Sequence, residues 1–162
     1  MSLRRHVILG FAAVASLTAC GFHVQGRTVL PEPLKVTYVQ AEDAQSEFVL
    51  GLRKALLSSG AKLARRDSEA SGTVQVLTDE VTERILSVSA SNIPREYELT
   101  YTVRFAVSAG ANELLPPQEV ALTRDYSFDE RTLLAKEHEE AILREALARD
   151  LVGIVMRRLA SL

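Results

Sequence analysis

Apolar and polar residues alternate along four stretches of this chain, a period-2 pattern typical of strands with one buried face. The stretches are 34–39, 73–90, 96–108 and 120–128. The alternation is clearest over 96–108, and it loses its phase around Asp79 in the second stretch, which predicts a bulge or bend there. The side chains expected to face the core are Leu34, Val36 and Tyr38 in the first strand, Tyr97, Leu99, Tyr101, Val103, Phe105 and Val107 in the third, and Val120, Leu122, Tyr126 and Phe128 in the last.

Two further stretches repeat their apolar residues every three or four positions, as one face of a helix does. The first begins at Ser46, a residue type that caps helix N-termini, and ends at Gly60, a typical C-terminal stop. The second is a longer helix over 137–162, which also spaces opposite charges for i,i+4 ion pairs. These pairs are Glu140 with Arg144 and Glu145 with Arg149.

The predicted order is strand, helix, three strands, helix, with 64–72 as a loop and 110–117 as a long hairpin connection. This order predicts an α+β fold, namely a four-stranded, mostly antiparallel or mixed sheet with two helices packed on one face. The composition, 47% hydrophobic and 25% charged, is that of one globular domain. We therefore expect residues 34–162 to form a single domain.

The chain begins like an exported precursor. Residues 1–19 combine a basic start with an apolar run that is too short for a permanent transmembrane helix. They end in Leu-Thr-Ala before Cys20, the only cysteine, which is typical of a bacterial lipoprotein signal; an ordinary secretory signal beside a buried cysteine is the alternative. We expect cleavage before Cys20, lipid attachment there, and a tether over 20–33. Inner-membrane lipoproteins resemble one another in having an Asp directly after the lipidated Cys. This chain has Gly21 there, which favours a location on the periplasmic side of the outer membrane.

The charge balance argues against general attraction to anionic polymers. The chain has 19 basic and 21 acidic residues, and removal of residues 1–19 takes away two of the arginines. A mildly acidic protein is a poor partner for nucleic acid, so any anion site must be local. Basic residues at strand ends and before the last helix can meet phosphorylated lipid head groups, although ordinary surface charge also explains them.

Candidate chemistry is sparse. After removal of the signal peptide only His23 and His138 remain as histidines, one in the tether and one near the last helix, which is too few ligands for a zinc site. The acidic residues within 137–140 spread around a helix start and do not face each other across a cleft. The sequence contains no G-x-S-x-G, P-loop or G-x-G-x-x-G pattern. We expect no enzyme, no metal and no cofactor apart from the covalent lipid on Cys20.

Three segments of the chain resemble the LptE family of lipopolysaccharide-assembly lipoproteins, also called RlpB. They are Cys-Gly-Phe-His-Val at 20–24, Arg-Glu-Tyr-Glu-Leu at 95–99 and Leu-Leu-Ala-Lys-Glu at 133–137. Length and element order are similar across the whole mature chain.

The resemblance implies an outer-membrane lipoprotein that plugs the LptD β-barrel, binds lipopolysaccharide and assists its assembly into the outer leaflet. A basic residue that the family associates with lipopolysaccharide binding corresponds to Lys136. A second family arginine falls on Ala90, so this chain departs there, and Arg95 is the nearest substitute. The alternative is a non-catalytic outer-membrane lipoprotein that acts as a structural or envelope-binding module without affinity for lipopolysaccharide.

Overall fold

A computed structural model describes residues 29–127 and 133–162, and for residues 133–137 it describes the backbone alone. The described residues form a five-stranded sheet in the order β2-β1-β3-β4-β5, together with two α-helices. The elements in chain order are η2 (Glu32–Leu34), β1 (Val36–Gln40), α2 (Glu47–Ser58), β2 (Lys62–Leu63), η3 (Asp67–Glu69), β3 (Gly72–Val88), β4 (Pro94–Ala109), β5 (Asn112–Ser127) and α3 (Leu133–Ala160).

The sheet has a parallel half and an antiparallel half. Strand β1 runs parallel to both of its neighbours, β2 and β3, whereas β3, β4 and β5 form an antiparallel meander. The predicted α+β class and mixed sheet are confirmed, but the predicted number of four strands is wrong. The missed strand, β2, has two residues, and two residues are too few to show any period.

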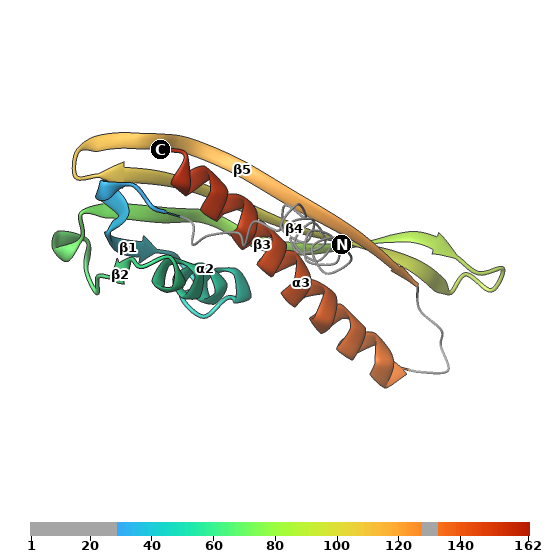
Figure 1. Cartoon of the computed structure of the whole chain (residues 1–162). Helices are drawn as coiled ribbons and strands as arrows, with labels where there is room; N and C mark the ends of the chain where they lie inside the picture. Colours follow the sequence, from blue (N-terminus) through green and yellow to red (C-terminus); the bar gives the residue numbers. More distant parts are fainter. Residues whose placement is uncertain (1–28, 128–132) are drawn as a thin grey trace, which may run out of the picture.

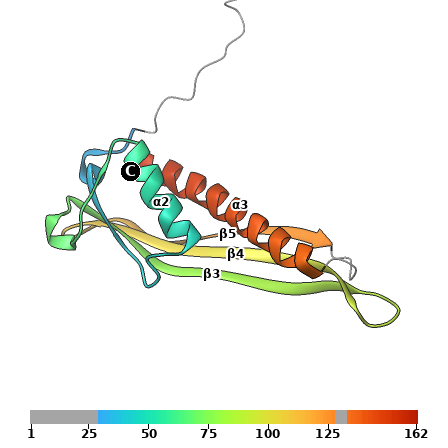
Figure 2. The ribbon, with the colours of Figure 1, turned by 90° about the horizontal axis from the view of Figure 1, so that it is seen from below.

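The molecule is elongated because β3, β4 and β5 run far beyond the short strand β1 (Figures 1 and 2). We call the end with η2, β1 and β2 the proximal end, and the end with the β3–β4 turn, residues 89–93, the distal end. Figure 2 draws α2 and α3 on the same side of the sheet. Side chains from both helices and from the sheet form one core, including Phe48, Leu52, Leu56, Val74, Leu99, Val103, Phe105, Leu147, Leu151 and Leu159.

Strand β4 confirms the alternation predicted for it, since all six odd positions from 97 to 107 are buried. The phase predicted for the first strand is wrong. In β1 the buried residues are Thr37 and Val39, while Val36 and Tyr38 are half-buried. Leu34 is buried, but it belongs to η2, which ends before β1 begins. Its burial therefore does not indicate which residues of β1 face the core.

The local signals for the first helix are confirmed. The Ser46 hydroxyl accepts a hydrogen bond from the Val49 amide at 3.1 Å and caps α2, and Gly60 has a φ of 91° just after the helix. The last helix starts at Leu133, four residues earlier than the predicted 137. Its two predicted ion pairs are present, with N···O distances of 2.7 and 3.0 Å.

The predicted long connection over 110–117 is wrong. The β4–β5 turn consists of Gly110, with a φ of 58°, and Ala111, and the rest of the segment belongs to β5. Pro116 and Pro117 are tolerated because β5 is an edge strand and its register shifts beside them. These two prolines therefore indicate an edge strand with a bulge, not a loop.

The beginning of β3 lies tightly against the segment that precedes β1. A Cβ on Gly72 would lie 2.4 Å from the Pro33 carbonyl oxygen, and the Ser71 hydroxyl donates to that oxygen at 2.9 Å. Leu30 is 7% exposed and belongs to the core, so packing begins within the segment that the sequence analysis assigned to the tether. Among the residues described, no helix is long and apolar enough to cross a bilayer.

Candidate functional site

The structure describes some of the predicted site residues but not all of them. Cys20 lies outside the described residues, as does Phe128 of the predicted last strand. Lys136 lies in the first turn of α3, although its side chain is not described. Arg95 is exposed near the start of β4, one residue after Pro94.

Arg95 and the first turn of α3 lie at the same end of the molecule although about 40 residues separate them in sequence. Figures 1 and 2 both show the start of α3 and the β3–β4 turn at the distal end. The first described residue, Val29, precedes η2 at the opposite, proximal end. Antiparallel pairing of β3 with β4 and the direction of α3 bring about this arrangement.

The distal part of the β3–β4 hairpin exposes apolar side chains beside charged ones. Ile85 is 52% exposed, and Leu86 and Val88 are exposed to a similar degree. Arg84 on the same strand makes an ion pair with Glu98 of β4 at 2.8 Å. A surface with both apolar and charged groups suits an amphipathic ligand.

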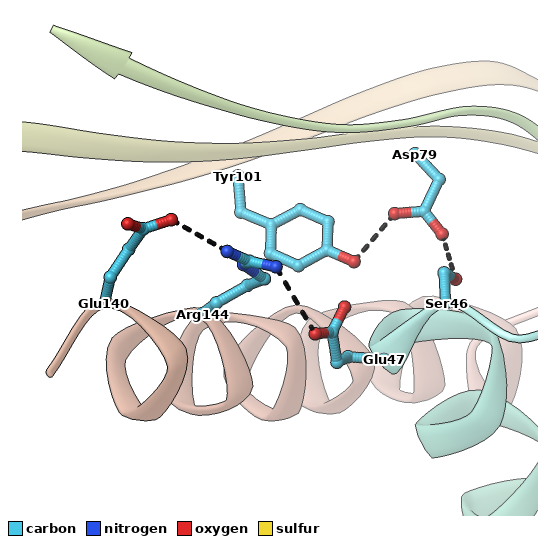
Figure 3. Close-up of polar contacts among 6 residues, drawn as sticks. All are labelled: Ser46, Glu47, Asp79, Tyr101, Glu140 and Arg144. Atoms are coloured by element: carbon cyan, nitrogen blue, oxygen red, sulfur yellow. Dashed lines mark hydrogen bonds and ion pairs between the residues drawn. The ribbon is translucent and has the colours of Figure 1, made fainter. Parts of the chain in front are cut away.

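A polar network joins the middle of the sheet to both helices (Figure 3). The Asp79 carboxylate of β3 accepts hydrogen bonds from the Tyr101 hydroxyl of β4, at 2.7 Å, and from the Ser46 hydroxyl at the start of α2. Each carboxylate oxygen has one donor, so the negative charge is satisfied where it is half-buried. The N-terminus of α2 is thereby fixed to the sheet.

A second branch of the network crosses between the helices. The Arg144 guanidinium of α3 donates to Glu140 one turn earlier at 2.7 Å and approaches Glu47 of α2 at 3.9 Å (Figure 3). Its Nε atom is buried and has no hydrogen-bond partner among the described residues. Because Glu47 follows Ser46 directly, both branches meet at the first turn of α2.

Two tyrosines on the helix side of the sheet donate to carboxylates. Burial of its ring, followed by the hydrogen bond to Asp79, raises the pKa of Tyr101 far above its usual value. Burial and a hydrogen bond to Glu83 raise the pKa of Tyr126 in the same way. Tyr126 also stacks on Tyr97, with ring centroids 5.3 Å apart. Both phenols therefore stay protonated donors at neutral pH.

The network links the sheet to α2, and α2 to α3. The Ser46 hydroxyl donates to Asp79 and accepts from the backbone of α2, so this one side chain both caps the helix and ties it to the sheet. In the residues for which side chains are described, no three histidine, cysteine or acidic side chains converge as metal ligands.

Sequence reasoning identified the cap at Ser46 and the pair of Glu140 with Arg144, but it missed the role of Asp79. The loss of alternation around Asp79 was the available signal. The register of β3 shifts between Val76 and Thr78, which puts Asp79 on the face where Tyr101 lies. Asp79 is an acidic residue on a buried face, and the neighbouring strand points tyrosines toward the same side. This combination predicts a hydrogen bond between a tyrosine and a carboxylate.

Comparison with known proteins gives the family. The LptE model, described as lipopolysaccharide-assembly, matches residues 33–159. The chain is 24% identical to the LPS-assembly lipoprotein LptE of Pectobacterium atrosepticum, over 96% of this chain and 84% of that protein. It is 23% identical to the LptE of Yersinia enterocolitica, over 94% of this chain and 73% of that protein.

Comparison with solved structures gives the same result as the comparison of sequences. The fold is similar to lipoprotein B of Nitrosomonas europaea, with a TM-score of 0.72 and 29% identity over 87% of this chain and 91% of that chain. It is also similar to rare lipoprotein B of Shewanella oneidensis, with a TM-score of 0.68 and 26% identity over 78% of this chain and 94% of that chain. Since the family model spans most of the chain from η2 to the end of α3, this protein belongs to the LptE lipopolysaccharide-assembly family.

Proposed function

We propose that this protein is a non-catalytic outer-membrane lipoprotein, anchored by lipid on Cys20 at the periplasmic side, that plugs the LptD β-barrel. In that position it binds lipopolysaccharide and assists its assembly into the outer leaflet. The observation that carries the proposal is the family match over residues 33–159.

The shape and surface of the sheet support the plug. The 16 residues of β4 span roughly 50 Å at the usual rise per residue, more than the apolar band of a membrane barrel. The face of the sheet opposite the core is polar. Thr82, Thr100 and Thr123 lie side by side there on three strands, and the last two are joined by a hydrogen bond of 3.0 Å. A polar surface is compatible with the wet interior of a large barrel.

The distal end supports lipopolysaccharide binding. Arg95 and the helix turn that carries Lys136 lie at this end, and both residue types form charge-assisted hydrogen bonds with phosphate. The exposed side chains of Ile85 and Val88 lie on the same hairpin and can contact acyl chains. Cations beside apolar groups match the phosphates and acyl chains of lipid A.

Isolation of the lipidated protein from its native envelope tests the plug. One stable, large β-barrel protein should co-purify with it, and the intact mass of the mature chain should show acyl groups on Cys20. Recovery of peptidoglycan or a soluble protein as the partner would favour the alternative, a structural or envelope-binding module. A cleaved chain with an unmodified cysteine would contradict the anchor.

Charge reversal tests lipopolysaccharide binding. Lys136→Asp and Arg95→Asp should each weaken binding by about ten- to a hundredfold, the equivalent of one charge-assisted contact. Lys136→Arg should bind like the parent, and the loss should shrink in high salt. The matched control is Arg66→Asp, which reverses an exposed cation at the proximal end. Equal binding by Lys136→Asp and the parent, with the fold intact, would refute the role of Lys136.

A further inference from the structure

The proximal end carries an apolar groove with lysines on its rim. The groove, of about 500 Å³, lies between the segment before η2 and the turn that leads from α2 into β2. Its lining includes Val29, Leu30, Val36 and Ala61, together with Lys35 and Lys62. Val29 is 82% exposed, so its side chain is not used by the core.

Sheet pairing places the backbones of the two lysines beside each other. The Lys62 amide donates to the Lys35 carbonyl oxygen at 2.8 Å, and Val36 pairs with Lys62 in the parallel β1–β2 ladder. Lys35 makes an ion pair with Glu32, whereas no ion pair involves Lys62 among the described side chains. An anion that approaches the groove therefore meets one paired and one available ammonium group.

More cations follow along the same segment. Lys62, Arg65 and Arg66 are all exposed, and Arg66 makes an ion pair with Glu69. Among the described side chains Lys62 and Arg65 make no ion pair, so they leave positive charge at this end of a chain whose total charge is negative. It would be attracted to an anionic lipid surface, where each cation within a Debye length contributes.

The segment between Cys20 and Val29 limits how far the groove can lie from the lipid anchor. Nine peptide units connect Cys20 to Val29, a reach of roughly 30 Å at full extension. We propose that the proximal groove docks on the anionic phospholipid head groups of the leaflet that holds the anchor, with Val29 in the head-group layer and Lys62 on phosphate. The inference rests on the lipid anchor of the proposed function. It adds an orientation, since the proximal end meets the membrane and the distal end points away along the barrel.

A membrane fits this groove better than a protein partner does. The occupant must be within reach of a short tether, must bear negative charge and must accept an isolated apolar side chain, and a leaflet with anionic head groups meets these three conditions at once. A second copy of this chain as the occupant is distinguishable in the test below, because it would shield Val29 without bringing it near lipid.

The test places a fluorophore at the groove in the lipidated, full-length mature protein. Lipidation blocks the Cys20 thiol, so Val29→Cys supplies a unique site for an environment-sensitive dye. The matched control is Ser91→Cys, an exposed residue of the β3–β4 turn at the distal end. Each labelled protein is reconstituted in vesicles of phosphatidylethanolamine with phosphatidylglycerol, with and without brominated acyl chains, and in vesicles in which phosphatidylcholine replaces phosphatidylglycerol.

The inference predicts a blue-shifted dye at position 29 that brominated lipid quenches, and a water-like dye at position 91. Lys62→Gln should lower the ratio of docked to undocked protein about fivefold, as expected for one cation at an anionic surface, and high salt should act in the same direction. Phosphatidylcholine should reduce docking as well.

Several outcomes would overturn the inference. They are a water-like dye at position 29, a blue shift without quenching by brominated lipid, which indicates contact with a second copy of this chain, and equal docking with phosphatidylcholine. An unacylated Cys20 in the intact mass would remove both the anchor and this inference. Absence of a co-purifying barrel would instead contradict the plug alone, because the dye measurement does not involve the barrel.

Discussion

Replacement of Tyr101 by phenylalanine should cost about 2 kcal/mol of unfolding free energy at pH 7. Tyr101 is 1% exposed, and phenylalanine keeps its ring, so no cavity forms. The loss is the hydrogen bond of 2.7 Å to the Asp79 carboxylate, and a bond to a charged group contributes about 1.5–3 kcal/mol. We take the lower part of this range because Asp79 is half-buried and keeps the Ser46 hydroxyl as a donor.

The same bond gives a pH signature. The raised pKa of folded Tyr101 means that above pH 10 the unfolded chain releases this proton while the folded protein retains it. The unfolded state then binds fewer protons, so stability decreases by about 1.4 kcal/mol per pH unit, and Tyr101→Phe lacks this contribution. The stability gap between parent and variant should therefore narrow from about 2 kcal/mol at pH 9 to about 0.6 kcal/mol at pH 11.

Urea denaturation followed by circular dichroism at pH 7, 9 and 11 measures this gap. The raised pKa of Tyr126 affects the stability of both proteins equally, so it cancels in the difference. A double-mutant cycle of Tyr101→Phe with Asp79→Ala should give a coupling energy of about 1.5–2 kcal/mol at pH 7. A gap below about 0.5 kcal/mol at pH 7, or a gap that stays constant up to pH 11, would refute this account of the network.

Three further predictions concern the core and its proximal edge. Val103→Asp should cost several kcal/mol because it buries an unpaired charge, whereas Thr102→Asp on the opposite face should cost less than about 1 kcal/mol; thermal denaturation compares them. Gly72→Ala should lower the urea midpoint by an amount equivalent to about 1–3 kcal/mol, because its Cβ would lie 2.4 Å from a backbone oxygen that must move. Leu30→Ala should cost about 2 kcal/mol and Val29→Ala less than about 0.5 kcal/mol in the same urea assay, and equal effects would show that Leu30 is not part of the core.

The sequence by itself determined those features whose cause is local. The alternation of β4 predicted its buried positions because a strand with one covered face repeats every two residues, so Val103 and Phe105 could be assigned to the core directly. The cap at Ser46 and the pair of Glu140 with Arg144 depend on spacing within one helix, and both were predictable for that reason. The segments at 95–99 and 133–137 also resembled the LptE family, to which the chain belongs.

The tertiary structure decided the features that depend on contacts between distant segments. Strand β2 exists because Lys62 and Leu63 pair with β1, and Thr37 is buried whereas its neighbours Val36 and Tyr38, between the same two strands, are half-buried. Asp79 faces Tyr101 only because a register shift in β3 rotates it toward the helices, a choice that depends on pairing with β4. Arg95 comes to the same end as the start of α3 through the direction of that helix along the sheet. A single sequence records which faces must be covered, whereas the partner that covers each face is fixed by packing across the whole chain.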